Sequence, residues 1–173
     1  MYNYIFLLGA PGVGKTTIAR LLKEQLNSPY LDYDWIRGFH LNKDWSNRDN
    51  KEKAMSLENL FFILKNYKKN GFCNVLVGGF RVYDMKKILK EFKDDNFIII
   101  TLFLTNDNIL KERVLTETRD SGWRDFKNSI EFNRRLKNEL KFPNEYKIDN
   151  TNKTPQEAVD QIIGILSKEK IPS

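Results

Sequence analysis

A glycine-rich run near the N-terminus has the spacing that binds the phosphates of a nucleotide. Residues 9–17 read Gly-Ala-Pro-Gly-Val-Gly-Lys-Thr-Thr, which fits the phosphate-binding pattern G-x-x-x-x-G-K-[ST], and the run lies between an apolar segment and a helical pattern. Glycines allow successive backbone N–H groups to turn inward around phosphate oxygens, and the positive end of the following helix adds to the field. We therefore expect nucleotide-binding residues at Gly9, Gly12, Val13, Gly14, Lys15, Thr16 and Thr17.

Two side chains of this loop have distinct expected roles. Lys15 is expected to contact the β- and γ-phosphates, and Thr16 to bind a Mg²⁺ ion that arrives with the nucleotide. A switch GTPase would also need an Asn-Lys-x-Asp guanine-binding motif, but residues 152–155 read Asn-Lys-Thr-Pro. An ATPase motor usually has an apolar strand ending in Asp-Glu, whereas residues 77–80 read Val-Gly-Gly-Phe. Both of these classes are therefore disfavoured.

Two carboxylates follow the second apolar segment of the chain. Asp32 and Asp34 are separated by one residue, so in an extended segment both lie on the same side. The carboxyl end of a strand beside a phosphate-binding loop is where an open α/β sheet binds its ligands. One interpretation is a pair that serves the metal and the substrate. The other is a solvated turn in which Asp34 caps a helix.

Arginines follow both the carboxylate pair and the third apolar segment. Arg37 comes directly after the pair, and Arg81 follows the small residues Gly78 and Gly79. Small residues at a strand end let a substrate approach the backbone, and a neighbouring guanidinium can hold an anionic or hydroxylated group. We therefore expect Gly79, Arg37 and Arg81 beside the substrate.

A polar stretch between two helical patterns is expected to form a small mobile lid. Residues 118–125 read Thr-Arg-Asp-Ser-Gly-Trp-Arg-Asp, and we place the lid at about residues 118–126. Arg119 is the expected catalytic arginine of this lid, and Arg124 is a second candidate. When such a lid closes over a phosphoryl group, its guanidinium groups can stabilise the phosphoryl charge and exclude water.

The elements that must position these residues alternate between short apolar runs and helical patterns. Five runs have the length and composition of buried parallel strands: Tyr4–Leu8, Tyr30–Asp32, Asn74–Val77, Phe97–Leu104 and Tyr146–Ile148. Helical periodicity lies between them at residues 18–26 and 54–67, and a capping box of Thr154 and Glu157 marks a last helix. This alternation predicts an α/β fold, a three-layer α/β/α sandwich with a five-stranded parallel sheet, in one domain over residues 1–173.

The motifs, in this order, resemble the small-molecule branch of the P-loop kinases, whose members include shikimate kinase, gluconate kinase and chloramphenicol phosphotransferase. The resemblance rests on the phosphate-binding loop and on residues 32–34, 78–79, 113–124 and 148–151, so it covers nearly the whole chain. It implies a P-loop NTPase fold and transfer of the γ-phosphate of ATP, with Mg²⁺, to a hydroxyl group of a small molecule. One departure is Phe80, which replaces the third glycine of the Gly-Gly-Gly segment of shikimate kinase.

The same resemblance implies a role for each matching residue. Asp32 would hold the water shell of Mg²⁺, and Asp34 would orient and deprotonate the acceptor hydroxyl. Arg113 would pack on the adenine, and Asn150 would belong to the nucleotide site. The substrate-binding residues are expected within the acceptor segment, about residues 35–70, and at Asp34, Arg37, Gly79 and Arg81. One arginine of the next helix is also expected to face the acceptor; we take Arg135, although periodicity does not decide between it and Arg134.

The aromatic residues of the acceptor segment leave the kind of acceptor open. Phe39 and Trp45 could stack on a base or cover a sugar, so a nucleoside or nucleotide is a serious rival to a shikimate-like or antibiotic acceptor. A polynucleotide 5′-hydroxyl kinase is an intermediate alternative. His40, in the same segment, is expected to be a solvent-exposed loop residue rather than a catalytic base.

The charge balance favours anionic ligands in general. Lys and Arg number 29 against 23 Asp and Glu, a formal net charge of +6. A nucleic-acid-associated protein that binds ATP only to power or gate binding is the alternative from another class, but the basic residues lie among acidic neighbours and form no basic run. We expect no nucleic-acid partner, and a monomer or homodimer. No apolar run reaches the roughly 20 residues needed to cross a bilayer, so a cytoplasmic location is expected.

Overall fold

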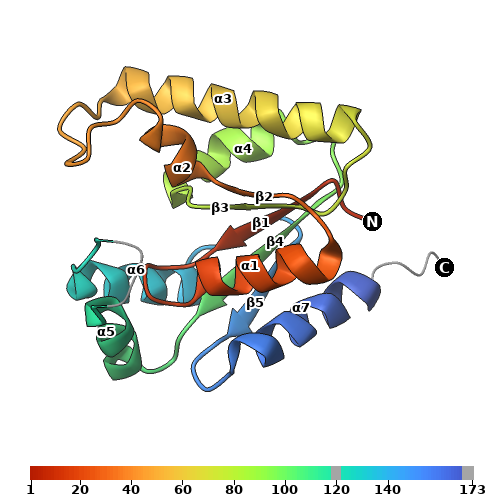
Figure 1. Ribbon diagram of the computed structural model, residues 1–173. Coiled ribbons are helices and arrows are strands. Elements are labelled where there is room, and N and C mark those ends of the chain that lie inside the picture. Colours follow the sequence, from red (N-terminus) through yellow and green to blue (C-terminus); the bar gives the residue numbers. More distant parts are fainter. Residues whose placement is uncertain (118–121, 169–173) are drawn as a thin grey trace.

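Five parallel strands form one sheet in the computed structural model, which describes residues 1–117 and 122–168 (Figure 1). The sheet order is β2-β3-β1-β4-β5. The strands are β1 (Tyr4–Leu8), β2 (Tyr30–Asp32), β3 (Val75–Gly78), β4 (Phe97–Phe103) and β5 (Glu145–Asp149). Every residue of β1 and β3 is buried, because helices cover a parallel sheet on both faces. The predicted α/β fold with a five-stranded parallel sheet is confirmed.

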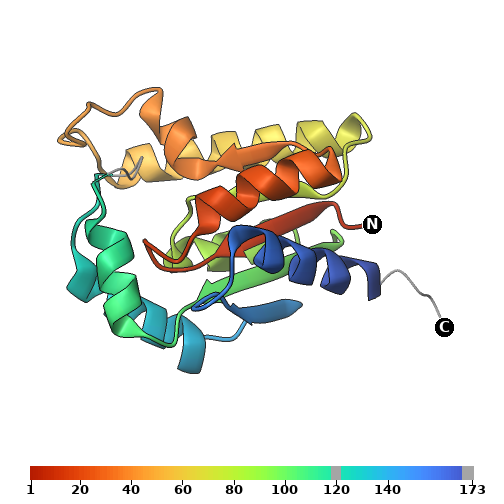
Figure 2. The same cartoon turned by 60° about the horizontal axis from the view of Figure 1, so that its bottom comes forward.

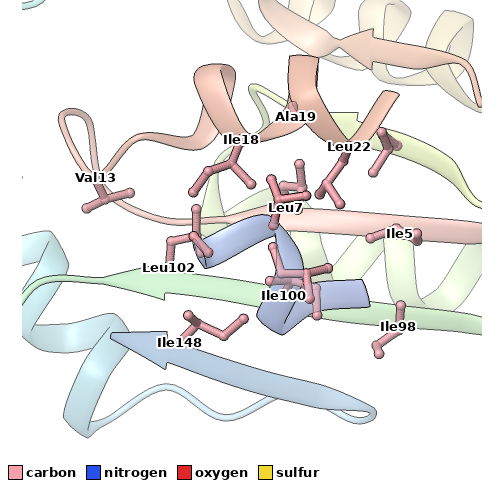
Figure 3. Close-up of a cluster of buried hydrophobic side chains, with 14 of the residues drawn as sticks. Ile5, Leu7, Val13, Ile18, Ala19, Leu22, Ile98, Ile100, Leu102 and Ile148 are labelled. Carbon is pink, nitrogen blue, oxygen red and sulfur yellow. The ribbon is translucent and has the colours of Figure 1, made fainter. Parts of the chain in front are cut away.

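Helices cover the two faces of the sheet (Figures 1 and 2). On one face lie α1 (Lys15–Leu26) and α7 (Pro155–Lys168), and on the other lie α3 (Asn50–Lys69) and α4 (Met85–Glu91). Successive residues of a strand point to opposite faces, so Ile5 and Leu7 pack under α1 (Figure 3). Tyr4 and Phe6 pack on the other face, under α3. The three layers thus follow from strands that are apolar on both sides.

The other helices gather near the carboxyl ends of the strands. They are α2 (Tyr33–Gly38), the 3₁₀ turn η1 (Val82–Asp84), α5 (Asp107–Leu115) and α6 (Phe126–Asn138). The sequence did not predict α2, because six residues are too short for an apolar period to be recognised. Among the described helices, none is long and apolar enough to span a membrane.

The capping box predicted for the last helix is confirmed. The Thr154 hydroxyl accepts a hydrogen bond from the Glu157 N–H at 3.2 Å, and the Glu157 carboxylate accepts one from the Thr154 N–H at 2.8 Å. Two backbone donors at the helix start are thereby satisfied. These bonds fix where β5 gives way to α7, and therefore the position of the loop between them.

Part of the predicted lid, residues 118–121 with Arg119, lies outside the described residues. Its described end is tied to the start of α6. The Trp123 Nε1–H donates to the Ser129 hydroxyl at 3.0 Å, and the Asp125 carboxylate caps the helix by accepting from the Asn128 N–H at 3.0 Å. Closure of the lid stays a prediction.

Candidate active site

The phosphate-binding loop joins β1 to α1 and depends on glycine for both its shape and its packing. Gly12 has φ 94°, and a Cβ atom there would lie 2.7 Å from a methyl carbon of Val114 in α5. At Gly9, a Cβ atom would lie 2.8 Å from the Leu102 carbonyl oxygen of β4. These positions therefore hold the loop close to α5 and β4 as well as permitting its turns.

Lys15 folds back over this loop. Its Nζ donates hydrogen bonds to the carbonyl oxygens of Gly9 at 2.7 Å and Ala10 at 2.9 Å. The side chain is half-buried and lies at the first residue of α1. Its positive charge therefore lies on the loop itself, next to the positive end of the helix dipole, where a phosphate would be attracted.

Arg113 and Asn150, both predicted to belong to the nucleotide site, are linked to each other and to the phosphate-binding loop. Asn150 follows β5, is 4% exposed, and donates from Nδ2 to the Val13 carbonyl oxygen at 2.8 Å. Arg113 of α5 donates from Nη1 to the Asn150 carbonyl oxygen at 3.3 Å and from Nη2 to that of Thr151 at 3.2 Å. The β5–α7 loop, α5 and the phosphate-binding loop are thus joined through these two side chains.

Asp32 is held by hydrogen bonds at both of its carboxylate oxygens. Oδ1 accepts from the Asp34 N–H at 3.0 Å, and Oδ2 accepts from the Tyr30 hydroxyl at 2.8 Å. Asp32 therefore caps α2, and the alternative in which Asp34 is the cap is wrong. Asp32, at the end of β2, is paired with Gly78, at the end of β3. The residue after Gly78, Gly79, lies directly against the Asp32 carboxylate.

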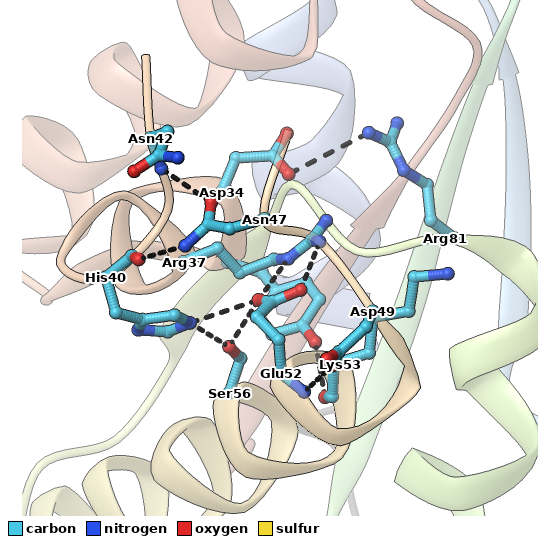
Figure 4. A network of polar contacts seen from close by, with 11 residues as sticks. Asp34, Arg37, His40, Asn42, Asn47, Asp49, Glu52, Lys53, Ser56 and Arg81 are labelled. Carbon is cyan, nitrogen blue, oxygen red and sulfur yellow. Dashed lines mark hydrogen bonds and ion pairs between the residues drawn. The ribbon is translucent and has the colours of Figure 1, made fainter. Parts of the chain in front are cut away.

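Asp34 lies in the first turn of α2 with its Oδ1 atom buried. Arg81 Nη2 is 3.8 Å from this oxygen, and no group in the described part of the chain donates a hydrogen bond to it (Figure 4). Burial raises the pKa of Asp34, while the positive charges of Arg81 and Lys15 oppose that shift. The structure thus brings Asp34, Arg81 and the loop lysine into one electrostatic environment.

Arg37 makes a buried ion pair with Glu52 of α3, a partner that the sequence analysis missed. Its Nε lies 2.9 Å from Glu52 Oε1 and its Nη2 lies 2.6 Å from Oε2 (Figure 4). The guanidinium carbon also lies 4.7 Å from the centre of the Trp45 ring. Arg37 is 3% exposed. The pair clamps α2, which carries Asp34, onto α3.

His40 extends this network, so its predicted exposure to solvent is wrong: the side chain is half-buried. Its Nε2 lies 3.1 Å from Glu52 Oε1 and 3.0 Å from the Ser56 hydroxyl oxygen. A serine, a histidine and a carboxylate also make hydrolase triads, but there the serine and the acid contact opposite ring nitrogens. Here both contact Nε2, so the group is a structural network. Glu52 and Ser56 are four residues apart and therefore lie on the same face of α3. This spacing is the sequence signal that could have indicated a common partner such as His40.

The remaining predicted arginines lie on or near α6. Arg135 is exposed, and its Nε lies 3.7 Å from Glu139 one turn along the helix. Arg124 donates to the Trp123 carbonyl oxygen at 3.0 Å. The roles of both arginines at the site stay predictions.

The sequence and the structure of this chain were compared with those of known proteins. No family model matches the chain. It is 29% identical over 169 residues, which are 94% of this chain and 83% of the relative, to a protein named "Putative adenylate kinase" from Pyrococcus abyssi. A gluconokinase from Sinorhizobium meliloti matches with a TM-score of 0.67 at 14% identity, over 95% of this chain and 91% of its own. The shikimate kinase from Acinetobacter baumannii matches with a TM-score of 0.63 at 20% identity, over 98% and 95%. The chain has the fold of the P-loop small-molecule kinases.

The P-loop kinase fold implies Mg²⁺, and the residues beside the loop fit this ion. Thr16 and Asp32 offer the hard oxygen atoms that Mg²⁺ and its water shell prefer. Within residues 1–117 and 122–168, no group of three or more His, Cys, Asp and Glu side chains could hold a metal ion.

Gly79→Ala is expected to destabilise this P-loop kinase fold more than an ordinary glycine substitution. Gly79 has φ 77°, which costs an L-residue about 1 kcal/mol, and an added Cβ would lie 2.0 Å from Asp32 Oδ1. Gly71→Ala is the matched control, because Gly71 has φ 81° but nothing within 4 Å of an added Cβ. Urea unfolding should show a loss of about 1 kcal/mol for Gly71→Ala and at least about twice that for Gly79→Ala. Equal losses would contradict the close contact with Asp32.

The Arg37–Glu52 ion pair is expected to make the free energy of unfolding decrease at acid pH. Hydrogen bonding from Arg37 is the largest of the effects that lower the pKa of Glu52 from 4.5 to about 2. Because the folded-state pKa lies below the unfolded value, the stabilisation is fully present above about pH 4.5 and is lost as the pH falls toward 2.

Glu52→Gln isolates this contribution. It should lower the free energy of unfolding at pH 7 by about 3 kcal/mol, because Arg37 is left buried without its counter-charge. The difference from wild type should shrink as the pH falls below 4.5. Glu58→Gln, at an exposed position of the same helix, should change little. A Glu52→Gln protein as stable as wild type at pH 7 would contradict the clamp.

Proposed function

We propose that this chain is an ATP-dependent kinase that transfers the γ-phosphate of ATP to a hydroxyl group of a small molecule. The observation that carries the proposal is Asp34. Its buried Oδ1 accepts no hydrogen bond from the described residues, and its charge interacts with that of Lys15 on the phosphate-binding loop. A carboxylate oxygen in this position is suited to accept the proton of an acceptor hydroxyl.

Each residue of the site then has a part in moving one phosphoryl group. Lys15 and the loop N–H groups hold the β- and γ-phosphates, and Asp34 takes the proton as the acceptor oxygen attacks in line. Arg113, fixed on the β5–α7 loop, borders the adenine. When bound, Mg²⁺ neutralises charge on the phosphates, and Thr16 and Asp32 are the residues that would hold it.

The name of the Pyrococcus abyssi relative favours a second candidate, in which the acceptor is the phosphate of a nucleotide. Two features of this site favour the alcohol. A phosphate is already ionised, so it needs no base and is repelled by the Asp34 carboxylate. In addition, Arg37 is engaged with Glu52 through two hydrogen bonds, which leaves Arg81 as the guanidinium next to Asp34 among the described residues.

A screen of ATP consumption over matched acceptors tests the proposal. The panel pairs adenosine with AMP and sugars with their phosphates, and adds hydroxy acids and aminoglycoside and phenicol antibiotics. ADP is followed by a coupled assay, and the product by phosphorus NMR. We expect phosphorylation of at least one alcohol. Turnover with AMP alone would establish the second candidate, and no acceptor-dependent ADP formation across the panel would contradict a kinase of either kind.

A further inference from the structure

Tyr30, the first residue of β2, has its hydroxyl group between the two residues expected to serve the metal. The hydroxyl donates to Asp32 Oδ2 at 2.8 Å. The Thr16 side chain hydrogen-bonds the same hydroxyl. Because a phenol has one proton and Tyr30 donates it to Asp32, Thr16 is the donor in that bond. Thr16, Tyr30 and Asp32 therefore form a hydrogen-bonded chain from α1 to the end of β2.

The fold keeps the Tyr30 ring in place from two sides. Trp35 packs edge-on against it, with the ring centres 5.2 Å apart. A Cβ atom at Gly78 would lie 3.3 Å from the Tyr30 hydroxyl oxygen, so a side chain at this position would crowd the hydroxyl group. Gly79 lies against Asp32, so the glycine that ends β3 accommodates the tyrosine and the next glycine accommodates the carboxylate.

The direction of the hydrogen bonds matters for a cation. A threonine hydroxyl has one proton and two lone pairs, and by donating its proton to Tyr30, Thr16 keeps both lone pairs for a metal ion. Tyr30 in turn donates to Asp32, which fixes one carboxylate oxygen while the Asp34 N–H fixes the other.

We propose that Tyr30 is a positioning residue for the metal–nucleotide complex, whose hydroxyl orients Thr16 and Asp32 together for a Mg²⁺ ion. The inference rests on the proposed function, because it takes the loop to bind a nucleotide with its metal. Tyr30 itself touches neither group. Its effect is on the strength with which Mg²⁺ and the nucleotide bind together.

The test is the coupling between Mg²⁺ and nucleotide in Tyr30→Phe, which keeps the ring and removes only the hydroxyl. The dissociation constant of a non-hydrolysable ATP analogue is measured by calorimetry with Mg²⁺ and again with EDTA. In Tyr30→Phe, the tightening by Mg²⁺ should fall by about tenfold or more, the usual effect of removing an outer-shell partner, while the constant in EDTA changes little. Tyr4→Phe is the matched control, because the Tyr4 hydroxyl donates to the Leu64 carbonyl oxygen at 3.3 Å in the core.

The possible results separate this inference from the proposed function. Equal Mg²⁺ coupling in wild type, Tyr30→Phe and Tyr4→Phe would overturn the inference, and so would equal weakening of binding with and without Mg²⁺, which marks a purely structural role. Neither result would contradict the proposed kinase function if the wild-type protein phosphorylates an alcohol. A wild-type protein that binds no nucleotide would overturn both.

Discussion

Lys15→Ala is expected to lower phosphoryl transfer by at least about a hundredfold in a protein that remains folded. The Nζ group bonds to two carbonyl oxygens of the phosphate-binding loop, whereas the core residues of α1 are Ile18, Ala19 and Leu22. Removing the lysine therefore removes positive charge at the phosphates and little apolar packing. Transition-state charge on the phosphoryl oxygens then has no ammonium group to stabilise it.

Lys23→Ala is the matched control for this prediction. Lys23 lies in the last turn of the same helix, is exposed, and is 3.8 Å from Glu24 in a surface ion pair of small energy. Both variants are compared by ADP formation and by thermal unfolding. We expect Lys23→Ala to retain wild-type activity and both to unfold close to the wild-type temperature. A folded Lys15→Ala protein with normal turnover would contradict the role of Lys15.

Much of the fold could be predicted because its signals are local. β1 and β4 are continuous apolar runs between turn residues, and the glycines and Lys-Thr of the phosphate-binding loop lie at fixed spacing. Thr154 and Glu157 are three residues apart, so their capping box is visible in the sequence. The parallel sheet followed from the alternation of strands and helices and from the rule of right-handed crossovers, whereas the order of its strands was not predicted.

The rest of the site depends on contacts between residues far apart in the chain. Glu52 lies 15 residues beyond Arg37, and only the packing of α2 on α3 brings them together. Sequence spacing treated Arg37 as a substrate anchor because its buried partner could not be seen. The sequence alternative also took Asp34 as a helix cap, whereas Asp32 caps α2, because the choice depends on where β2 ends.

The second large effect is expected at Asp34. Asp34→Asn keeps the size and polarity of the side chain but removes its ability to accept a proton, so kcat should fall by about a hundredfold or more. Nucleotide affinity should change little, because the expected nucleotide contacts lie on the phosphate-binding loop. Asp32→Asn should differ: loss of a carboxylate from the metal's surroundings should also raise the Mg²⁺ concentration needed for half-maximal rate.

A pH profile separates a proton acceptor from a residue that only shapes the pocket. The active form of Asp34 is the carboxylate, so kcat/KM should fall as the pH drops through its pKa, which burial has raised above the ordinary value. The Arg81 guanidinium, 3.8 Å from Asp34 Oδ1, favours the ionised form of Asp34. Arg81→Ala should therefore raise the pKa of Asp34 further and move the acid limb of the kcat/KM profile to higher pH. Lys23→Ala should leave the limb where it is. If Arg81→Ala lowers the rate without moving the acid limb, or if Asp34→Asn retains the wild-type kcat, Asp34 is not the base.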